Sequence, residues 1–343
     1  MTRIKDDFTN SRIGWIDWAK SFCMYLVILG HCHIRGSEQF VVQYIYSFHM
    51  MFFFFLSGML CKRELSISSI KKDIKYIILP YFTYGLILIT FYFCRARSLE
   101  INMLIRNFES LCLGDDISIG PIWFLPALFV CKQLFLLAKR LKLFSICLYY
   151  LLFVLSFFSV YYISKYHLNI PFFVDSALCG LPFFFAGNEC NLFIDKYRTI
   201  KWYVLAGLFI LLLGVSVASF CYNGCANLAS CTFGQSVYAY YVVAFSAIIS
   251  NSILCIMIGN LRSSFVTCMA YGSIVTLGLH GIPLTLLNYY LPIAFGKEPS
   301  TYSLYQAFFY SIITLYFCYL CILFLDKRCP SLFGLRGTWN NSR

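Results

Sequence analysis

Charged side chains are scarce in this chain of 343 residues. Asp, Glu, Lys and Arg together make up 12% of the sequence, whereas roughly a quarter of an ordinary soluble domain is charged. Hydrophobic residues make up 60%, and aromatic residues alone make up 20%. A water-soluble fold could not bury this much apolar surface, so the composition excludes a soluble protein and predicts one that crosses a membrane several times.

Patterns typical of metal sites are also missing. The 17 cysteines form no cluster with histidine at the spacing of a zinc site, so no bound metal is expected. Most of them lie inside apolar runs, where cysteine packs as a small hydrophobic residue. One group, Cys221, Cys225 and Cys231, lies in a short polar loop. The sequence leaves open whether two of these three form a disulfide.

No polar segment is long enough for a separate soluble domain, and the longest expected outer loop covers about 95–119. Residues 1–343 are therefore expected to form one membrane domain, with cytoplasmic tails at 1–14 and 326–343. A helix needs about 20 apolar residues to span a bilayer. The sequence predicts an all-α protein with about ten transmembrane helices, at residues 15–34, 40–61, 76–94, 120–138, 143–163, 175–194, 202–221, 236–258, 266–291 and 304–325.

The positive charges are unevenly distributed between the two sets of loops. If the N-terminus is cytoplasmic, most of the 27 Lys and Arg residues fall on the cytoplasmic side, as the positive-inside rule requires. This distribution predicts that both termini are cytoplasmic. Contact with anionic membrane lipid then accounts for the net charge of +12, and no nucleic-acid partner is expected.

The first run carries ionisable residues, which are costly in a bilayer and usually mark function. Lys20 and His31 are about three helical turns apart, so they share one face, separated by about 16 Å. Asp17 lies one turn before Lys20 and can pair with it. Asp17 and Lys20 could equally be interfacial anchors, whereas His31 lies deeper and is the stronger candidate for chemistry.

Two further candidates lie in the next two runs. His49 is in the middle of the second run, at an expected depth similar to that of His31, which suggests proton chemistry or substrate binding. Lys72 and Lys75 stand at the cytoplasmic start of the third run. They are either anchors of the positive-inside kind or a cationic site for the phosphates of a cytoplasmic donor.

Four more positions carry weaker signals. Ser57 ends the second run and alone reads as a small packing residue. Trp123 lies between two prolines, where an interfacial tryptophan is common. His280 is flanked by glycines, which suggests an interrupted helix that lines a cavity. Glu189, in the sixth run, is either a paired structural acid or part of a polar pathway.

Six segments follow one another across almost the whole chain: "RIGWIDWAKSFCMYLVILGH" (12–31), "YSFHMMFFFFLSGML" (46–60), "KDIKYIILPYF" (72–82), "GPIWFLPALF" (120–129), "LHGIPL" (279–284) and "CPSLFG" (329–334). Together they resemble the integral-membrane acyltransferase family 3, and most closely its fucose 4-O-acetylase-like branch of sugar O-acetyltransferases. One departure is "FHMM" in place of the usual "FHMP". It removes a proline kink beside His49.

The resemblance implies a multi-pass protein of the inner (plasma) membrane that transfers an acyl group, usually acetyl. The donor would be cytoplasmic acyl-CoA, with no bound cofactor, and the acceptor a hydroxyl of a surface polysaccharide or a lipid-linked glycan. Such a transfer needs a base for the hydroxyl proton. The resemblance implies that His31 is the essential histidine, that Lys20 and its neighbour Asp17 support it, and that the remaining functional positions are His49, Ser57, Lys72, Lys75 and Trp123.

A transporter or flippase for a polar solute or glycan precursor is the alternative from another class. Intramembrane His, Lys and Glu residues serve proton coupling equally well. The absence of a visible sequence repeat and the order of the six segments weigh against it. A catalytically silent scaffold would not account for His31.

Overall fold

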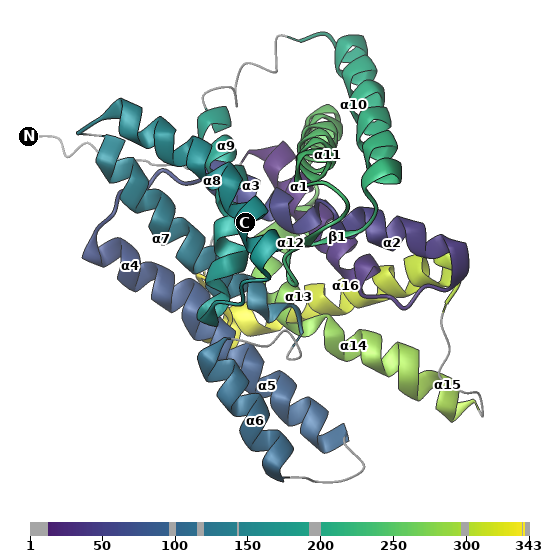
Figure 1. The fold of residues 1–343 in the computed structure, drawn as a ribbon. Helices are drawn as coiled ribbons and strands as arrows, with labels where there is room; N and C mark the ends of the chain where they lie inside the picture. The colour runs from purple at the N-terminus through teal and green to yellow at the C-terminus, as the bar shows by residue number, and fades with distance from the viewer. Residues whose placement is uncertain are drawn as a thin grey trace, which may run out of the picture.

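The computed structural model describes residues 13–95, 101–114, 120–142, 144–191, 200–295, 302–337 and 339. Within them the fold is helical (Figure 1), apart from a short antiparallel hairpin of β1 (Ala226–Asn227) and β2 (Thr232–Phe233). The helices are α1 (Gly14–Gly30), α2 (Gln39–Tyr46), α3 (His49–Met59), α4 (Ile67–Asp73), α5 (Leu79–Arg95), α6 (Ile101–Leu113), α7 (Phe124–Lys142), α8 (Ile146–Tyr166), α9 (Val174–Cys190), α10 (Trp202–Asn223), α11 (Val237–Ile258), α12 (Ser264–Tyr271), α13 (Ser273–Leu279), α14 (Gly281–Thr285), α15 (Leu291–Ala294) and α16 (Leu304–Arg328).

In the described part of the chain, eight helical segments are long and apolar enough to cross a membrane. They coincide with eight of the ten predicted runs. The other two runs form α1 and α9, which are 17 residues long each. At 1.5 Å per residue, 17 residues span about 25 Å, less than the roughly 30 Å of a hydrocarbon core. The all-α membrane fold is confirmed, whereas ten full spans and the cytoplasmic termini stay predictions.

Helix α1 lies in the middle of the bundle and packs against α3, α11, α12 and α16. Its residues Ala19, Cys23 and Val27 are completely buried, and their spacing of four residues places them on one face of the helix. The Ser21 hydroxyl donates to the carbonyl oxygen of Val266 at 2.7 Å and ties α1 to α12. By contrast, α10 lies at the edge of the bundle (Figure 1) and exposes most of its apolar side chains, as a helix in contact with lipid does.

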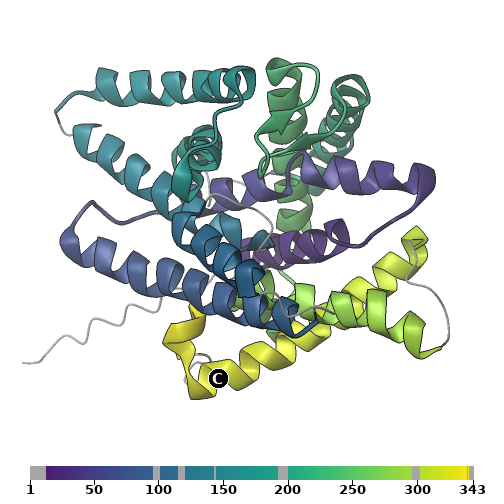
Figure 2. The same ribbon diagram turned by 60° about the horizontal axis from the view of Figure 1, so that its bottom comes forward.

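The two ends of the bundle are distinct. Figure 2 shows most long helices running in a common direction, with the start of α4 at one side and the start of α2 and the α14–α15 segment at the other. Helix α1 ends near the start of α2, because only a short turn joins them. We call this the His31 end, and the side where α4 begins the Lys72 end.

Helices α3 and α9 are in close contact through two glycines. A Cβ atom at Gly58 would overlap the backbone of Phe184, and one at Gly187 would overlap the backbone of Phe55. The Asn188 amide donates to the carbonyl oxygen of Gly58 at 3.1 Å, which adds a polar contact to this interface. Small residues of this kind let helix backbones approach closely inside a membrane.

We expect Gly58→Ala to destabilise the protein by about 1–3 kcal/mol, because the added methyl group forces α3 and α9 apart. Thermal unfolding in detergent measures the effect. Gly207→Ala in α10 is the matched control, since no atom lies within 4 Å of its would-be Cβ and alanine is the better helix former. Equal stability of the two variants would contradict the close contact.

The segment predicted as a long outer loop contains helix α6. This helix lies along α5, where the Tyr81 hydroxyl donates to the Leu111 carbonyl oxygen at 2.8 Å and Gly85 makes room for the Leu111 side chain. The helix has 13 residues and carries Arg106 and Glu109, so its sequence lacks the apolar length that marks a span. The segment expected as the longest outer loop therefore contains a short helix that the sequence did not predict.

Candidate active site

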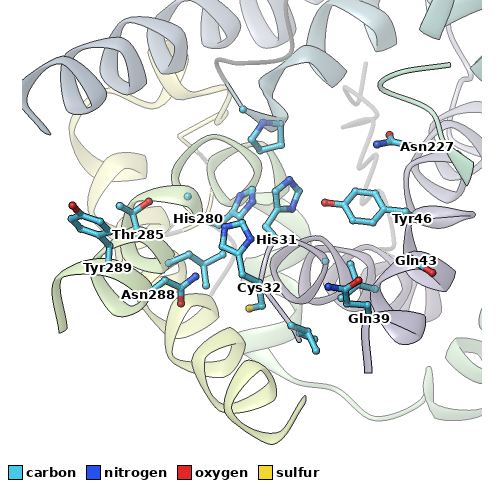
Figure 3. Close-up of a pocket in the computed structure, with 18 of the residues that line it drawn as sticks. His31, Cys32, Gln39, Gln43, Tyr46, Asn227, His280, Thr285, Asn288 and Tyr289 are labelled. Atoms are coloured by element: carbon cyan, nitrogen blue, oxygen red, sulfur yellow. The ribbon is translucent and has the colours of Figure 1, made fainter. Parts of the chain in front are cut away.

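A cavity of about 800 Å³ opens at the His31 end of the bundle. Its walls come from the end of α1, from α2, from the end of α5, from Gly120 and Pro121 before α7, from β1 and from α14 with the turn that follows it (Figure 3). Segments far apart in the sequence therefore meet around one space. This volume is within the range of small-molecule sites.

His31 is the residue directly after α1 and lines the cavity. Its ring nitrogen Nδ1 lies 2.7 Å from the carbonyl oxygen of Val27, one turn earlier in the same helix. Because a carbonyl oxygen can only accept, Nδ1 carries the proton that it donates. In the neutral ring Nε2 then holds the free lone pair, and His31 is oriented as a base.

His280 lies against His31, with ring centroids 5.0 Å apart in an edge-to-face arrangement. It is completely buried at the junction of α13 and α14 and also lines the cavity. Its Nδ1 donates to the carbonyl oxygens of Thr276 and Leu277, at 2.9 and 3.1 Å, while Nε2 has no hydrogen-bond partner among the described residues. The pair presents two unprotonated ring nitrogens at one place.

His49 does not line the cavity. It is buried behind Tyr46, with ring centroids 5.3 Å apart, and Tyr46 is the residue that reaches the cavity and approaches His31 at 6.1 Å. The Nδ1 of His49 donates to the carbonyl oxygen of Ile45 at 2.7 Å. His49 can therefore act on the cavity through Tyr46 but does not face it.

The remaining cavity wall is polar and aromatic. Figure 3 shows Tyr46, Gln39, Gln43 and Asn227 on one side of the two histidines, and Thr285, Asn288 and Tyr289 on the other. Sequence analysis did not single out any of these side chains. Hydroxyl, amide and aromatic groups that converge on one cavity are suited to orient a polar ligand.

The other members of the first-helix motif lie away from this cavity. Asp17 and Lys20 are half-buried near the start of α1, and neither lines the cavity. At 1.5 Å per residue, Lys20 is about 16 Å from His31 along the helix axis. The structure thus separates Lys20 from the cavity by about three helical turns.

Lys72 and Lys75 are exposed on α4 and the π-helical turn that follows it, Ile74–Ile78. Lys75 has its Nζ 5.5 Å from the ring centroid of Tyr76, and neither lysine lines the cavity. The predicted cationic pair is therefore accessible, but at a different place from His31.

Between these two lysines, Asp73 is buried and forms an ion cluster that sequence analysis missed. Its carboxylate lies 2.6 Å from Nζ of Lys132 and 3.1 Å from the guanidinium of Arg63, and the Gln133 amide donates to its second oxygen at 3.0 Å. Charges inside a membrane protein need partners. Lys132, in the middle of the apolar helix α7, was therefore the one feature of the sequence that could have indicated a buried ion pair. The cluster joins α4 to α7.

Three other predicted residues, Glu189, Trp123 and Ser57, lie in contact with neighbouring side chains or helices and away from the cavity. Glu189 accepts hydrogen bonds from Tyr149 and Tyr150 at 2.8 and 3.3 Å and lies 3.8 Å from Nζ of Lys142. Trp123 is buried beside Phe173, with ring centroids 6.2 Å apart. Ser57 is half-buried in α3, next to the close contact with α9. None of the three predicted residues lines the cavity.

The three cysteines expected in one polar loop are unpaired, and the expectation was wrong for Cys221, which lies in the last turn of α10. Cys221, Cys225 and Cys231 are all free thiols in this structure, and Cys225 lines the cavity beside β1. In the described residues no group of His, Cys, Asp and Glu side chains is arranged to hold a metal ion.

A family model described as an acyltransferase domain matches residues 13–323 of this chain. The chain belongs to acyltransferase family 3. No curated protein and no solved structure matches it. Because the match begins before α1 and ends within α16, the acyltransferase domain includes both the histidine cavity and the exposed cations. The fucose 4-O-acetylase-like branch stays a prediction.

The candidate functional residues of this membrane acyltransferase lie at two opposite ends of the helix bundle. The histidine pair faces a polar cavity at the His31 end, whereas Lys72 and Lys75 are exposed away from it. An acyl transfer needs a base that accepts the proton of the attacking hydroxyl, and His31 and His280 each present an unprotonated Nε2 atom at the cavity.

Proposed function

We propose that this acyltransferase moves an acetyl group from cytoplasmic acetyl-CoA to a hydroxyl of a cell-surface glycan or its lipid-linked precursor, at the bacterial inner membrane. The observation that supports this most is the cavity of about 800 Å³ at His31. A ring with its Nδ1–H bonded to Val27 offers Nε2 to a ligand, and amide and tyrosine side chains around it suit the hydroxyls of a sugar.

The proposed reaction is a direct transfer. Nε2 of His31 accepts the proton of the sugar hydroxyl while the hydroxyl oxygen forms a bond to the thioester carbonyl carbon. The carbon–sulfur bond then breaks, the thiolate of CoA leaves and takes up the proton, and the sugar carries the acetyl ester. Tyr46, beside His31, can donate to the oxyanion that forms on the carbonyl oxygen.

The cations at the Lys72 end are the proposed site for the phosphates of the donor. Lys72 and Lys75 are exposed, and the positive-inside distribution of the sequence assigns this end to the cytoplasm. Phosphate groups form charge-assisted hydrogen bonds with such cations. In this arrangement the donor is bound from the cytoplasm and the acceptor in the cavity at the outer end.

We expect the double substitution Lys72→Gln/Lys75→Gln to raise the KM for acetyl-CoA by about tenfold, since two exposed charge pairs are lost. The kcat at saturating donor should change little, because neither residue is near His31. Steady-state kinetics of CoA release measure both constants. Lys201→Gln/Lys327→Gln removes two other exposed lysines and serves as the matched control; an equal rise in KM there would contradict a specific donor site.

The proposed function itself is tested on glycans from cells that express the protein or an empty vector, grown with deuterated acetate. Mass spectrometry should find a deuterated acetyl ester, lost after mild base, on a surface glycan or lipid-linked precursor only in the expressing cells. Purified protein should also release CoA when both substrates are supplied. If the ester is absent and membranes that contain a glycan acceptor turn over no acetyl-CoA, the proposal is wrong and the transporter alternative gains support.

A further inference from the structure

The cavity wall carries one fixed charge among its described residues. Its lining includes Arg95, whereas the described lining residues contain no Asp or Glu. A site for a neutral sugar needs no fixed charge, because hydroxyl groups are bound by neutral donors and acceptors. A guanidinium with no carboxylate beside it among the described lining residues therefore requires an explanation.

Arg95 is the last residue of α5 and is half-buried. Its Cζ atom lies 4.3 Å from the ring centroid of Tyr289, which is a cation–π contact. In the described part of the chain, Arg95 takes part in none of the ion pairs found at Asp73 and Glu189. A guanidinium is always charged and carries five N–H donors, so these donors are available to a ligand.

The surroundings of Arg95 form one wall of the cavity. Tyr92 lies one turn earlier in α5 and also lines the cavity. Asn288, next to Tyr289, has a buried side-chain oxygen without a hydrogen-bond partner among the described residues. Figure 3 shows Asn288 and Tyr289 on the same side of the two histidines. This wall therefore combines a fixed cation, an aromatic contact and an unpartnered amide oxygen, which can accept a hydrogen bond from a hydroxyl group of the ligand.

We propose that the acceptor bound in this cavity is anionic, and that Arg95 binds its carboxylate or phosphate group. This inference rests on the proposed acetyl transfer and names the class of acceptor. Arginine recognises both groups through two parallel hydrogen bonds. An anion held at the end of α5 fixes one end of the acceptor, while a hydroxyl at its other end faces His31.

Two sources supply such an anion, namely a uronic-acid carboxylate within the glycan and the diphosphate of a polyprenyl carrier. Direct binding to the purified full-length protein in nanodiscs separates them. Two pairs of probes are used, and each pair compares an anionic compound with its neutral counterpart. The pairs are methyl glucuronide with its neutral methyl ester, and farnesyl diphosphate with farnesol. Microscale thermophoresis measures the affinity for each probe, and thermal unfolding checks that each variant is folded.

We expect at least one anionic probe to bind about tenfold or more tightly than its neutral partner. Arg95→Gln should remove this preference, and Arg95→Lys should keep part of it, because lysine retains the charge but not the fork of donors. Arg35→Gln is the matched control, since Arg35 is exposed at the same end of the bundle and does not line the cavity.

The proposal is overturned if neither anionic probe is preferred, or if Arg95→Gln keeps the preference. It is also overturned if Arg35→Gln loses the preference to the same extent, because the effect is then one of general surface charge. CoA release is measured separately with the preferred probe class and with glycan acceptors. A preference that depends on Arg95, found together with no acetyl transfer to any acceptor, would refute the proposed function while leaving the anion site in place.

Discussion

Substitution of His31 by asparagine is expected to lower kcat for acetyl transfer by about two to four orders of magnitude, the usual contribution of a general base. Asparagine keeps an N–H donor close to the position of Nδ1, so the hydrogen bond to the Val27 carbonyl oxygen can persist. It has no atom at the position of Nε2. The variant therefore removes the proposed base while it changes the end of α1 as little as possible.

The measurement is the rate of CoA release by purified protein with a saturating glycan acceptor, together with thermal unfolding as a check on folding. His167→Asn is the matched control, because His167 follows α8 in a left-handed conformation with φ 48°, which asparagine tolerates well. It does not line the cavity. If His31→Asn retains the kcat of the unaltered protein, His31 is not the base and His280 becomes the candidate.

Loss of the Asp73 carboxylate is expected to have the largest effect on stability. Asp73→Ala leaves Lys132 and Arg63 without the anion that lies 2.6 and 3.1 Å from them. Removal of one partner from a fully buried ion pair costs about 3–5 kcal/mol, and this is an upper bound here, because the Lys132 and Arg63 side chains are 17% and 39% exposed and water solvates part of the charge left behind. Denaturant unfolding in mixed micelles should show this loss as a lower midpoint.

Two further variants decide whether the buried charge is the cause. Glu64→Ala removes an exposed carboxylate from the loop that leads to α4, and its effect should be under about 1 kcal/mol. The double variant Asp73→Ala/Lys132→Met should recover part of the loss, since the uncompensated lysine is then gone. If the double variant is as unstable as Asp73→Ala, the cluster does not act through the Lys132 charge.

Hydropathy predicted the membrane fold because each long helix is apolar over its whole length. It overestimated the lengths of α1 and α9, because the apolar runs in the sequence extend beyond the last residues of these helices. It also missed α6, because this helix is short and carries charge. The ion cluster at Asp73 was not predicted, because it joins α4 to α7 and no local spacing reveals such a pairing.

The candidate site was predicted only in part for a similar reason. The spacing of Lys20 and His31 places both on one helix face, but a shared face does not bring residues three turns apart into one cavity. The contact between His31 and His280 depends on how α1 packs against α13. Arg95 and Asn288 resemble ordinary polar residues near helix ends until the fold places them around His31.

The way in which the histidines are held bears on how such a protein can change its substrate. His31, His49 and His280 each donate through Nδ1 to the carbonyl oxygen of the residue four positions earlier in the chain. The direction of each ring is therefore set by the local backbone and not by the other walls of the cavity. Substitutions at other lining positions, such as Asn227 in β1 and Tyr289 in the π-helical turn Leu286–Tyr290, can change the cavity wall without displacing the histidine rings. The chemistry and the choice of acceptor are thus open to separate variation.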